Sequence, residues 1–231
     1  MISISTPRKR AAVAKPNIEH LADIPADGGS IEGIVTIPPK ARGIVLVAQA
    51  ASDQRHSLAN QYLTARLHEA GFGTLLMGLL TPVEAGYPNA SFDIKLLTER
   101  LEAATHWLIK KPRVKSLRLG YLVEETATAA ALYAAAQLKP EIKAIVSCSG
   151  RPDLAFPALS QVDAPTLFIV GANDHAVARI NQRSCNLLSG DAVAEIIAGA
   201  TNLFEEPAIE EVTRLAGNWF SHHLQEKRPK R

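Results

Sequence analysis

The chain has 231 residues, of which 47% are hydrophobic and 21% charged, and its formal net charge is +2. That length suits one large domain or two small ones, and the apolar share allows a sizeable buried core. The near balance of charge gives no reason to expect a nucleic acid or a membrane as partner, and no apolar run approaches the length of a membrane span.

The two ends of the chain are basic, with "PRKR" near the start and "KRPKR" at the end. Runs of this kind are usually solvated, so we expect disordered tails at 1–16 and 226–231. We see no internal repeat and no linker between them, and we therefore predict a single domain over 17–225.

The first half of this domain alternates apolar runs with amphipathic stretches. Strand character is found at 30–39, 42–50 and 73–80, helical spacing at 57–72 and 91–111, and a loop at 81–89. Gly71 lies where a glycine commonly follows a helix, and Pro112 ends the longer helix.

The second half continues the alternation. Strands are predicted at 117–122, 144–150, 166–174 and 194–201, helices at 126–138, 178–190 and 207–224, and a loop with one helical turn at 151–165. Strands that are apolar throughout and alternate with helices indicate an α/β fold, with a mostly parallel central sheet covered on both faces. The first two strands have no helix between them, so we expect an antiparallel edge on the N-terminal side. Ligands are expected at the carboxyl ends of the strands.

Several segments are similar to those of one enzyme family, both in their residues and in their order along the chain. They are "RGIVLVAQAASDQRHS", "LGYLVEETATAAAL", "SGRPDLA", "APTLFIVGAND" and "AGATNLFEEP". Together they resemble α/β hydrolases of the dienelactone-hydrolase-like group, over nearly everything from Ser30 to Leu224. The resemblance implies the α/β-hydrolase fold, whereas function has to be argued from the site.

The catalytic positions that the resemblance implies are mostly substituted. In this fold the nucleophile sits in G-x-S-x-G, and the acid and the histidine follow it along the chain. The pattern places the nucleophile at Glu125, the acid at Asp174 and the histidine at Asn202, so that only Asp174 matches. Gln49 and Ala50 replace the usual His-Gly of the oxyanion loop.

These substitutions remove the groups that acyl transfer needs. A serine hydrolase needs a hydroxyl that an imidazole can deprotonate. Glu125 has no proton to give at neutral pH, and Asn202 cannot take one. Val123 and Ala127 replace the glycines that flank the nucleophile, and Val123 is stiff. We therefore expect a less strained turn, or one displaced outward.

Two further residues are predicted at the former oxyanion hole and the pocket rim, Thr126 and Arg151. Thr126 follows the nucleophile position, and Arg151 follows a predicted strand. Two roles are open for Arg151. It pairs with Glu125 or Asp174, or it anchors its own loop to Asp153.

The main prediction is a catalytically degraded hydrolase, a pseudoenzyme that binds a small molecule or a protein partner. A first alternative is a rewired enzyme, an isomerase, cyclase or lyase, in which Glu125 works with His56 or Asp174 as an acid–base pair. A second is an active hydrolase with a non-standard triad. A further reading makes Glu124 and Glu125 an acidic pair that only stabilises the start of a helix.

The remaining expectations concern compartment, ligand and assembly. The two cysteines, Cys148 and Cys185, have no metal or redox spacing, so a reducing compartment fits them and we expect a cytoplasmic protein without cofactor or metal. Cys148 is predicted to be a buried, inert thiol. Carboxylates at Glu125 and Asp174 favour a neutral or cationic ligand. A homo-oligomer stays open.

Overall fold

The computed structural model describes residues 18–26, 29–52, 56–201 and 203–225. Its centre is an eight-stranded sheet in the order β1-β2-β4-β3-β5-β6-β7-β8. The pairs β1–β2 and β2–β4 are antiparallel, and all later pairs are parallel. The predicted fold class is therefore confirmed, including the antiparallel edge on the N-terminal side.

The strands follow the apolar runs of the sequence. Their bounds are β1 (Ile18–Ala26), β2 (Gly29–Ile37), β3 (Ile44–Gln49), β4 (Gly73–Gly78), β5 (Leu119–Glu124), β6 (Ile142–Cys148), β7 (Thr166–Gly171) and β8 (Ala192–Ile197). The α-helices are α1 (Leu58–Glu69), α2 (Pro82–Ala85), α3 (Ile94–Ile109), α4 (Ala127–Gln137), α5 (His175–Cys185) and α6 (Ala208–His223). Two 3-10 segments, η1 (Ala90–Phe92) and η2 (Pro152–Gln161), complete the described elements.

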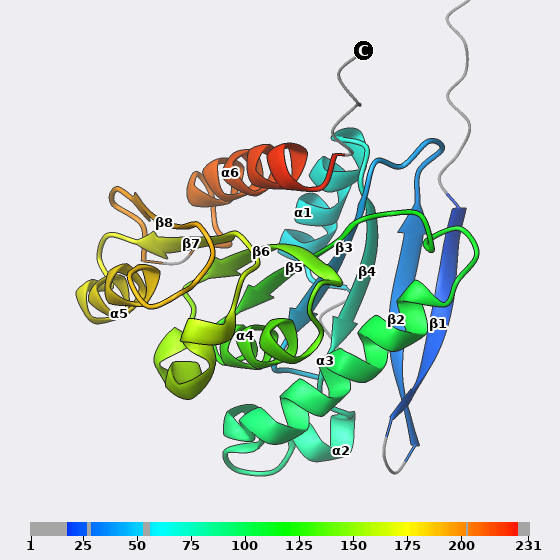
Figure 1. Ribbon diagram of the computed structural model, residues 1–231, viewed down its shortest axis with the longest axis horizontal. Coiled ribbons are helices and arrows are strands. Elements are labelled where there is room, and N and C mark those ends of the chain that lie inside the picture. Colours follow the sequence, from blue (N-terminus) through cyan, green and yellow to red (C-terminus); the bar gives the residue numbers. More distant parts are fainter. Residues whose placement is uncertain (1–17, 27–28, 53–55, 202, 226–231) are drawn as a thin grey trace, which may run out of the picture.

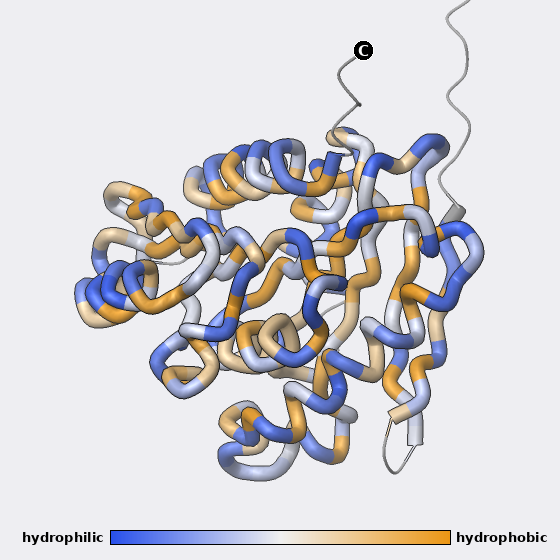
Figure 2. The backbone as a smooth tube through the Cα atoms, viewed as in Figure 1, coloured by the Kyte–Doolittle hydropathy of each residue, from blue (hydrophilic) through white to orange (hydrophobic). Residues whose placement is uncertain are grey.

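Helices cover both faces of the sheet. Helices α1 and α6 lie on one face, and α3, α4 and α5 on the other (Figure 1). Each face has its own apolar cluster, and the strands β3, β5 and β6 are buried between them. The hydropathy colouring follows this layering. Hydrophobic residues dominate the central strands, whereas hydrophobic and hydrophilic residues alternate along the helices (Figure 2). No helix of the described residues is long and apolar enough to cross a membrane.

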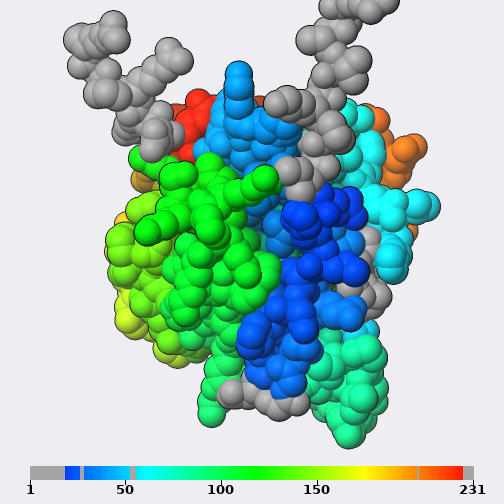
Figure 3. Space-filling view, turned by 90° about the vertical axis from the view of Figure 1, so that its right-hand side faces the viewer, coloured from blue at the N-terminus to red at the C-terminus, as the bar shows by residue number. Residues whose placement is uncertain are grey.

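Two elements were not predicted, and the helix expected at 178–190 lies earlier, as α5. Strand β1 was not predicted, because its residues are mixed in character and it has a sheet neighbour on one side only. It forms an open edge beside α3, seen in dark blue in Figure 3. The segment 81–89 was predicted to be a loop, yet it contains α2, where Thr81 and Glu84 form a capping box. The predicted tails at 1–16 and 226–231 lie outside the described residues.

The strand order fixes where a ligand can bind. Along the sheet β3 is followed by β4 on one side and by β5 on the other, so the direction of winding reverses between β3 and β5. Crevices in open α/β sheets form at the carboxyl ends of strands at such a reversal. Gln49 ends β3 and Glu124 ends β5, so these two residues flank the crevice.

A close approach of β5 to α6 makes one glycine necessary. A Cβ atom on Gly120 would lie 2.8 Å from a ring carbon of Phe220 and 3.1 Å from the carbonyl oxygen of Ala144, and Phe220 is fully buried. Gly217 in α6 has no atom near the corresponding position. The two glycines therefore form a matched pair for the same substitution.

We predict that Gly120→Ala lowers the free energy of unfolding by about 1–3 kcal/mol, because the core around Phe220 is overpacked. Gly217→Ala should raise it by up to about 1 kcal/mol, because alanine favours the helix. Chemical denaturation of both variants checks this. Equal effects of the two substitutions would contradict the packing of α6 against β5.

Candidate functional site

A strained turn joins β5 to α4. Glu125 follows the last residue of the strand and has a backbone φ of 45°, in the left-handed region that non-glycine residues rarely adopt. Thr126 comes next and precedes the helix. The Glu125 N–H donates to the carbonyl of Cys148 at 3.2 Å, and its own carbonyl accepts from the N–H of Arg151 at 3.0 Å. The segment that ends β6 therefore holds the turn in place.

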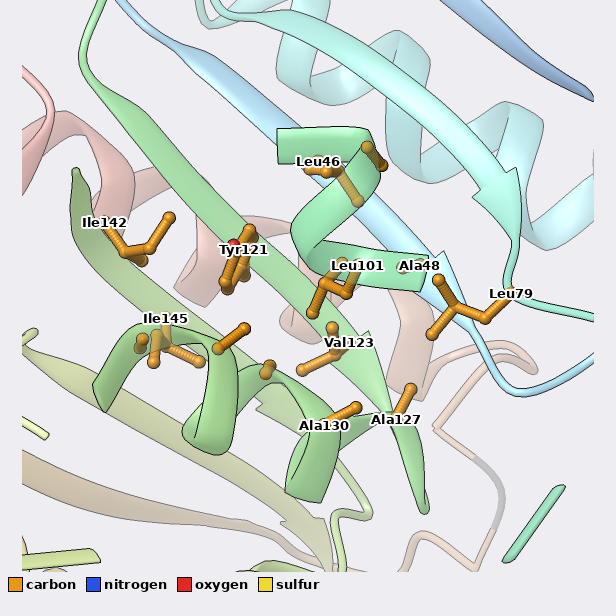
Figure 4. Close-up of a cluster of buried hydrophobic side chains, with 14 of the residues drawn as sticks. Leu46, Ala48, Leu79, Leu101, Tyr121, Val123, Ala127, Ala130, Ile142 and Ile145 are labelled. Carbon is orange, nitrogen blue, oxygen red and sulfur yellow. The ribbon is translucent and has the colours of Figure 1, made fainter. Parts of the chain in front are cut away.

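The expectation of a less strained turn is wrong. Val123 and Ala127, which replace the flanking glycines, are both fully buried in the apolar cluster between β5 and α4 (Figure 4). Helix α4 contributes small side chains, including Ala129 and Ala130, to the same apolar cluster. Because these neighbours are small, the side chains of Val123 and Ala127 fit without relaxing the turn.

Glu124 is partly buried and linked to the neighbouring strand. Its Oε1 accepts a hydrogen bond from Nε2 of Gln49, which also donates to Oδ1 of Asn60 at 3.2 Å. Burial raises the pKa of Glu124 to about 7, the Gln49 hydrogen bond lowers it, and the adjacent charge of Glu125 raises it further. Near neutral pH this carboxyl group therefore exists in both protonation states.

Glu125 itself is exposed and lies at the junction of two hollows. The larger, of about 400 Å³, has a lining that includes Phe92, Glu124, Glu125, Arg151, Asp174 and Phe204. The smaller, of about 290 Å³, includes Gln49, Ala50, Asn60, Glu124, Glu125 and Phe204. The reading in which Glu125 only supports a helix start is not favoured, because α4 has no acidic residue in its first turn.

Asp174 lies at the wall of the larger hollow. Its carboxylate caps α5 by accepting the N–H of Val177 at 3.1 Å, so that one of its roles is structural. The neighbouring His175 is exposed. Asn202, the predicted position of the family histidine, lies outside the described residues.

His56 does not converge with the acids. It is exposed and belongs to the lining of neither hollow. The structure therefore gives no support to an acid–base pair of His56 and Glu125. Nothing in the sequence fixes the position of His56, because it lies in the connection between β3 and α1.

Of the two readings of Arg151, the local one is correct. Its Nε and Nη2 donate to the two carboxylate oxygens of Asp153 at 2.8 and 2.7 Å. This bidentate pair lowers the pKa of Asp153 and occupies the guanidinium charge, although Arg151 still lines the larger hollow.

The other predicted rim residues occupy both hollows. Ala50 lines the smaller hollow, and Thr126 lines the larger one, with a buried hydroxyl that has no hydrogen-bond partner among the described residues. Cys148 is fully buried at the wall of the larger hollow, and burial raises the pKa of its thiol, as expected of an inert cysteine. Within the described ranges, no group of three or more His, Cys, Asp or Glu residues could hold a metal ion.

Sequence reasoning missed the part that Glu124 and Asn60 play. The sequence analysis considered Glu124 only as part of an acidic pair with Glu125. The signal that could have found it is its position at the carboxyl end of an apolar strand, now seen as β5. Its link to Gln49 joins residues 75 positions apart and depends on the strand order.

Comparison with known proteins gives both whole-chain and partial matches. No family model matches the chain. Two proteins from strains of Mycobacterium tuberculosis, each named "Putative phosphoribosyl transferase", are 43% identical over 215 residues, which is 93% of this chain. The match spans 48% of their length, so the chain corresponds to about half of these relatives.

Solved structures match most of the chain. The dienelactone hydrolase of Anabaena variabilis is 39% identical, with a TM-score of 0.86 over 90% of this chain and 99% of that protein. A dienelactone hydrolase-like promiscuous phosphotriesterase from metagenomic libraries shares the fold, with 16% identity and a TM-score of 0.74 over 90% and 99% of the two chains. On the extent and identity of the first of these matches, the chain belongs to the dienelactone hydrolase family of α/β hydrolases.

Proposed function

We propose that this chain binds a small molecule at the turn between β5 and α4 and does not form an acyl-enzyme there. The observation that carries the proposal is the carboxylate of Glu125 on a strained turn, where the family holds its nucleophile. A carboxylate has no proton to lose at neutral pH and is a weaker nucleophile than an activated hydroxyl. On this view the protein is a pseudoenzyme with respect to ester hydrolysis.

Retention of the strain supports a binding role. A non-glycine residue with positive φ costs on the order of 1–3 kcal/mol, and such residues cluster at active sites and ligand-binding sites. The turn also remains next to two open hollows, of about 400 and 290 Å³, instead of a filled cleft. Open hollows of this size favour a small ligand over a protein partner.

The acids around the turn bear on the ligand's charge. Glu125 and Asp174 line the larger hollow, and the guanidinium of Arg151 is paired with Asp153. An anion would meet uncompensated negative charge, so the ligand is neutral or cationic. Self-association and a cytoplasmic location stay predictions.

The name of the mycobacterial relatives belongs to proteins about twice as long as this chain. The site described here contains the residues of a hydrolase scaffold, and we assign no transferase step to it. The proposal for this chain does not depend on what the other half of these relatives does.

We predict no hydrolysis of short activated esters above a heat-treated sample, and no labelling by a fluorophosphonate probe, because no activated hydroxyl lies at the turn. Gel fluorescence and a chromogenic ester assay check this. Glu125→Ala should leave both signals at background. Stoichiometric labelling of the wild type that disappears on denaturation would revive the reading of an active hydrolase.

One observation favours a second candidate, an isomerase, cyclase or lyase that moves a proton. The pKa of Glu124 lies at about 7, which is where a general acid–base group works best near neutral pH. Glu124 also lines both hollows. In this version the proton is held by Glu124, and Gln49 orients its carboxyl group. Burial keeps the pKa of Glu124 high, and the charge of Glu125 adds to this effect.

A pH-dependent stability measurement tests that assignment. The unfolded chain loses the Glu124 proton near pH 4.5, its ordinary pKa, whereas the folded protein keeps it to about 7. Between these values the folded state binds more protons, so this residue lowers stability as the pH rises. Glu124→Gln lacks this titration.

We predict that Glu124→Gln gains stability relative to the wild type by up to about 1.4 kcal/mol per pH unit between pH 4.5 and 7, and that the difference levels off above this range. Denaturant unfolding across this range checks it. Glu141→Gln, an exposed acid at the opposite end of β6, should track the wild type. Parallel profiles for Glu124→Gln and the wild type would remove the second candidate.

A further inference from the structure

The larger hollow is electrically unbalanced. Glu124, Glu125 and Asp174 contribute three carboxyl groups to its lining, and Arg151 is the one guanidinium among the described residues that line it. That guanidinium donates hydrogen bonds to both carboxylate oxygens of Asp153. Glu125 makes no side-chain hydrogen bond or ion pair with any described residue. Among the described residues nothing compensates its charge, so this lining favours cations.

Aromatic rings lie next to these acids. Phe204 lines both hollows, and Phe92, which is 55% exposed, lines the larger one. The face of an aromatic ring attracts a positive charge, and organic ammonium ions are recognised by rings of this kind beside carboxylates. Hard metal ions bind through several oxygen ligands, whereas an organic ammonium ion also packs against rings, so the combination favours an organic cation.

A buried hydroxyl provides an independent sign of a ligand. Thr126 is 4% exposed and belongs to the lining of the larger hollow, yet its Oγ1 has no hydrogen-bond partner among the described residues. Leaving a buried polar group unpaired is costly, and native proteins avoid it. A polar ligand at the base of the hollow would supply the missing partner.

We infer that the site takes a small organic ammonium ion, with its charged nitrogen at Glu125 and its apolar groups against Phe204. A hydroxyl or N–H of the same ligand would lie toward Thr126. The inference rests on the proposed binding function and specifies its ligand class. A hollow of about 400 Å³ is large enough for such a molecule.

Three probes of nearly equal shape separate charge from size. Choline carries a positive charge, 3,3-dimethyl-1-butanol is its neutral counterpart, and 3,3-dimethylbutyrate is an anion of similar bulk. Titrations followed by ligand-observed NMR or calorimetry give the affinity of each for the full chain. We expect choline to bind about tenfold more tightly than the alcohol, with the butyrate weakest.

Two variants assign the preference to the site. Glu125→Gln should reduce the advantage of choline over the alcohol to within about threefold, whereas Glu141→Gln should leave it unchanged. Glu125 is exposed, so the variant is expected to fold, and circular dichroism checks this. Added salt should weaken choline binding but not alcohol binding.

The possible outcomes distinguish the ligand class from the proposed function. Equal binding of choline and the alcohol, a preference for the butyrate, or no binding of any probe would overturn the inference. Binding of the alcohol alone, without fluorophosphonate labelling, would leave the proposed function standing with a different ligand. Labelling of the wild type would reject the proposed function itself.

Discussion

The left-handed backbone at Glu125 is the constraint on which the rest of the site depends. It is fixed by two backbone hydrogen bonds, to Cys148 at the end of β6 and from Arg151 beyond it. Arg151 is in turn fixed by its bidentate pair with Asp153. The parallel sheet and the loop after β6 thus determine the turn, and the identity of its central side chain does not.

On the proposed function, this scaffold keeps the strained turn at Glu125 and carries a carboxylate there in place of a hydroxyl nucleophile. The carboxylate of Glu125 is presented at the junction of two hollows, as a hydroxyl would be in a hydrolase. Glu124 sits behind it across the crevice from Gln49, and the proximity of the two acids helps to keep Glu124 protonated near neutral pH. A site built in this way binds and orients, and it can move a proton. On the proposed function, it does not form the acyl-enzyme of a serine hydrolase.

The sequence predicts the sheet well because burial on both faces demands continuous apolar runs, such as those of β3 and β7. It fails at β1, where an edge strand needs no such run. It also fails at the turn. Val123 and Ala127 predict a less strained backbone, but the small side chains of α4 leave room for them. The raised pKa of Glu124 was not predictable, because it depends chiefly on burial in the folded chain, with a smaller contribution from the charge of Glu125.

The central claim is that the turn survives and only the reacting groups are lost. The most direct measurement is fluorophosphonate labelling of the double variant Glu125→Ser, Asn202→His, with Val123 and Ala127 left in place. The account predicts labelling at least about a hundredfold faster than for Glu125→Ser alone, because a general base contributes that much. A folded double variant that stays as unreactive as the single one would contradict it, since restoring the two reacting groups would then not restore the reaction.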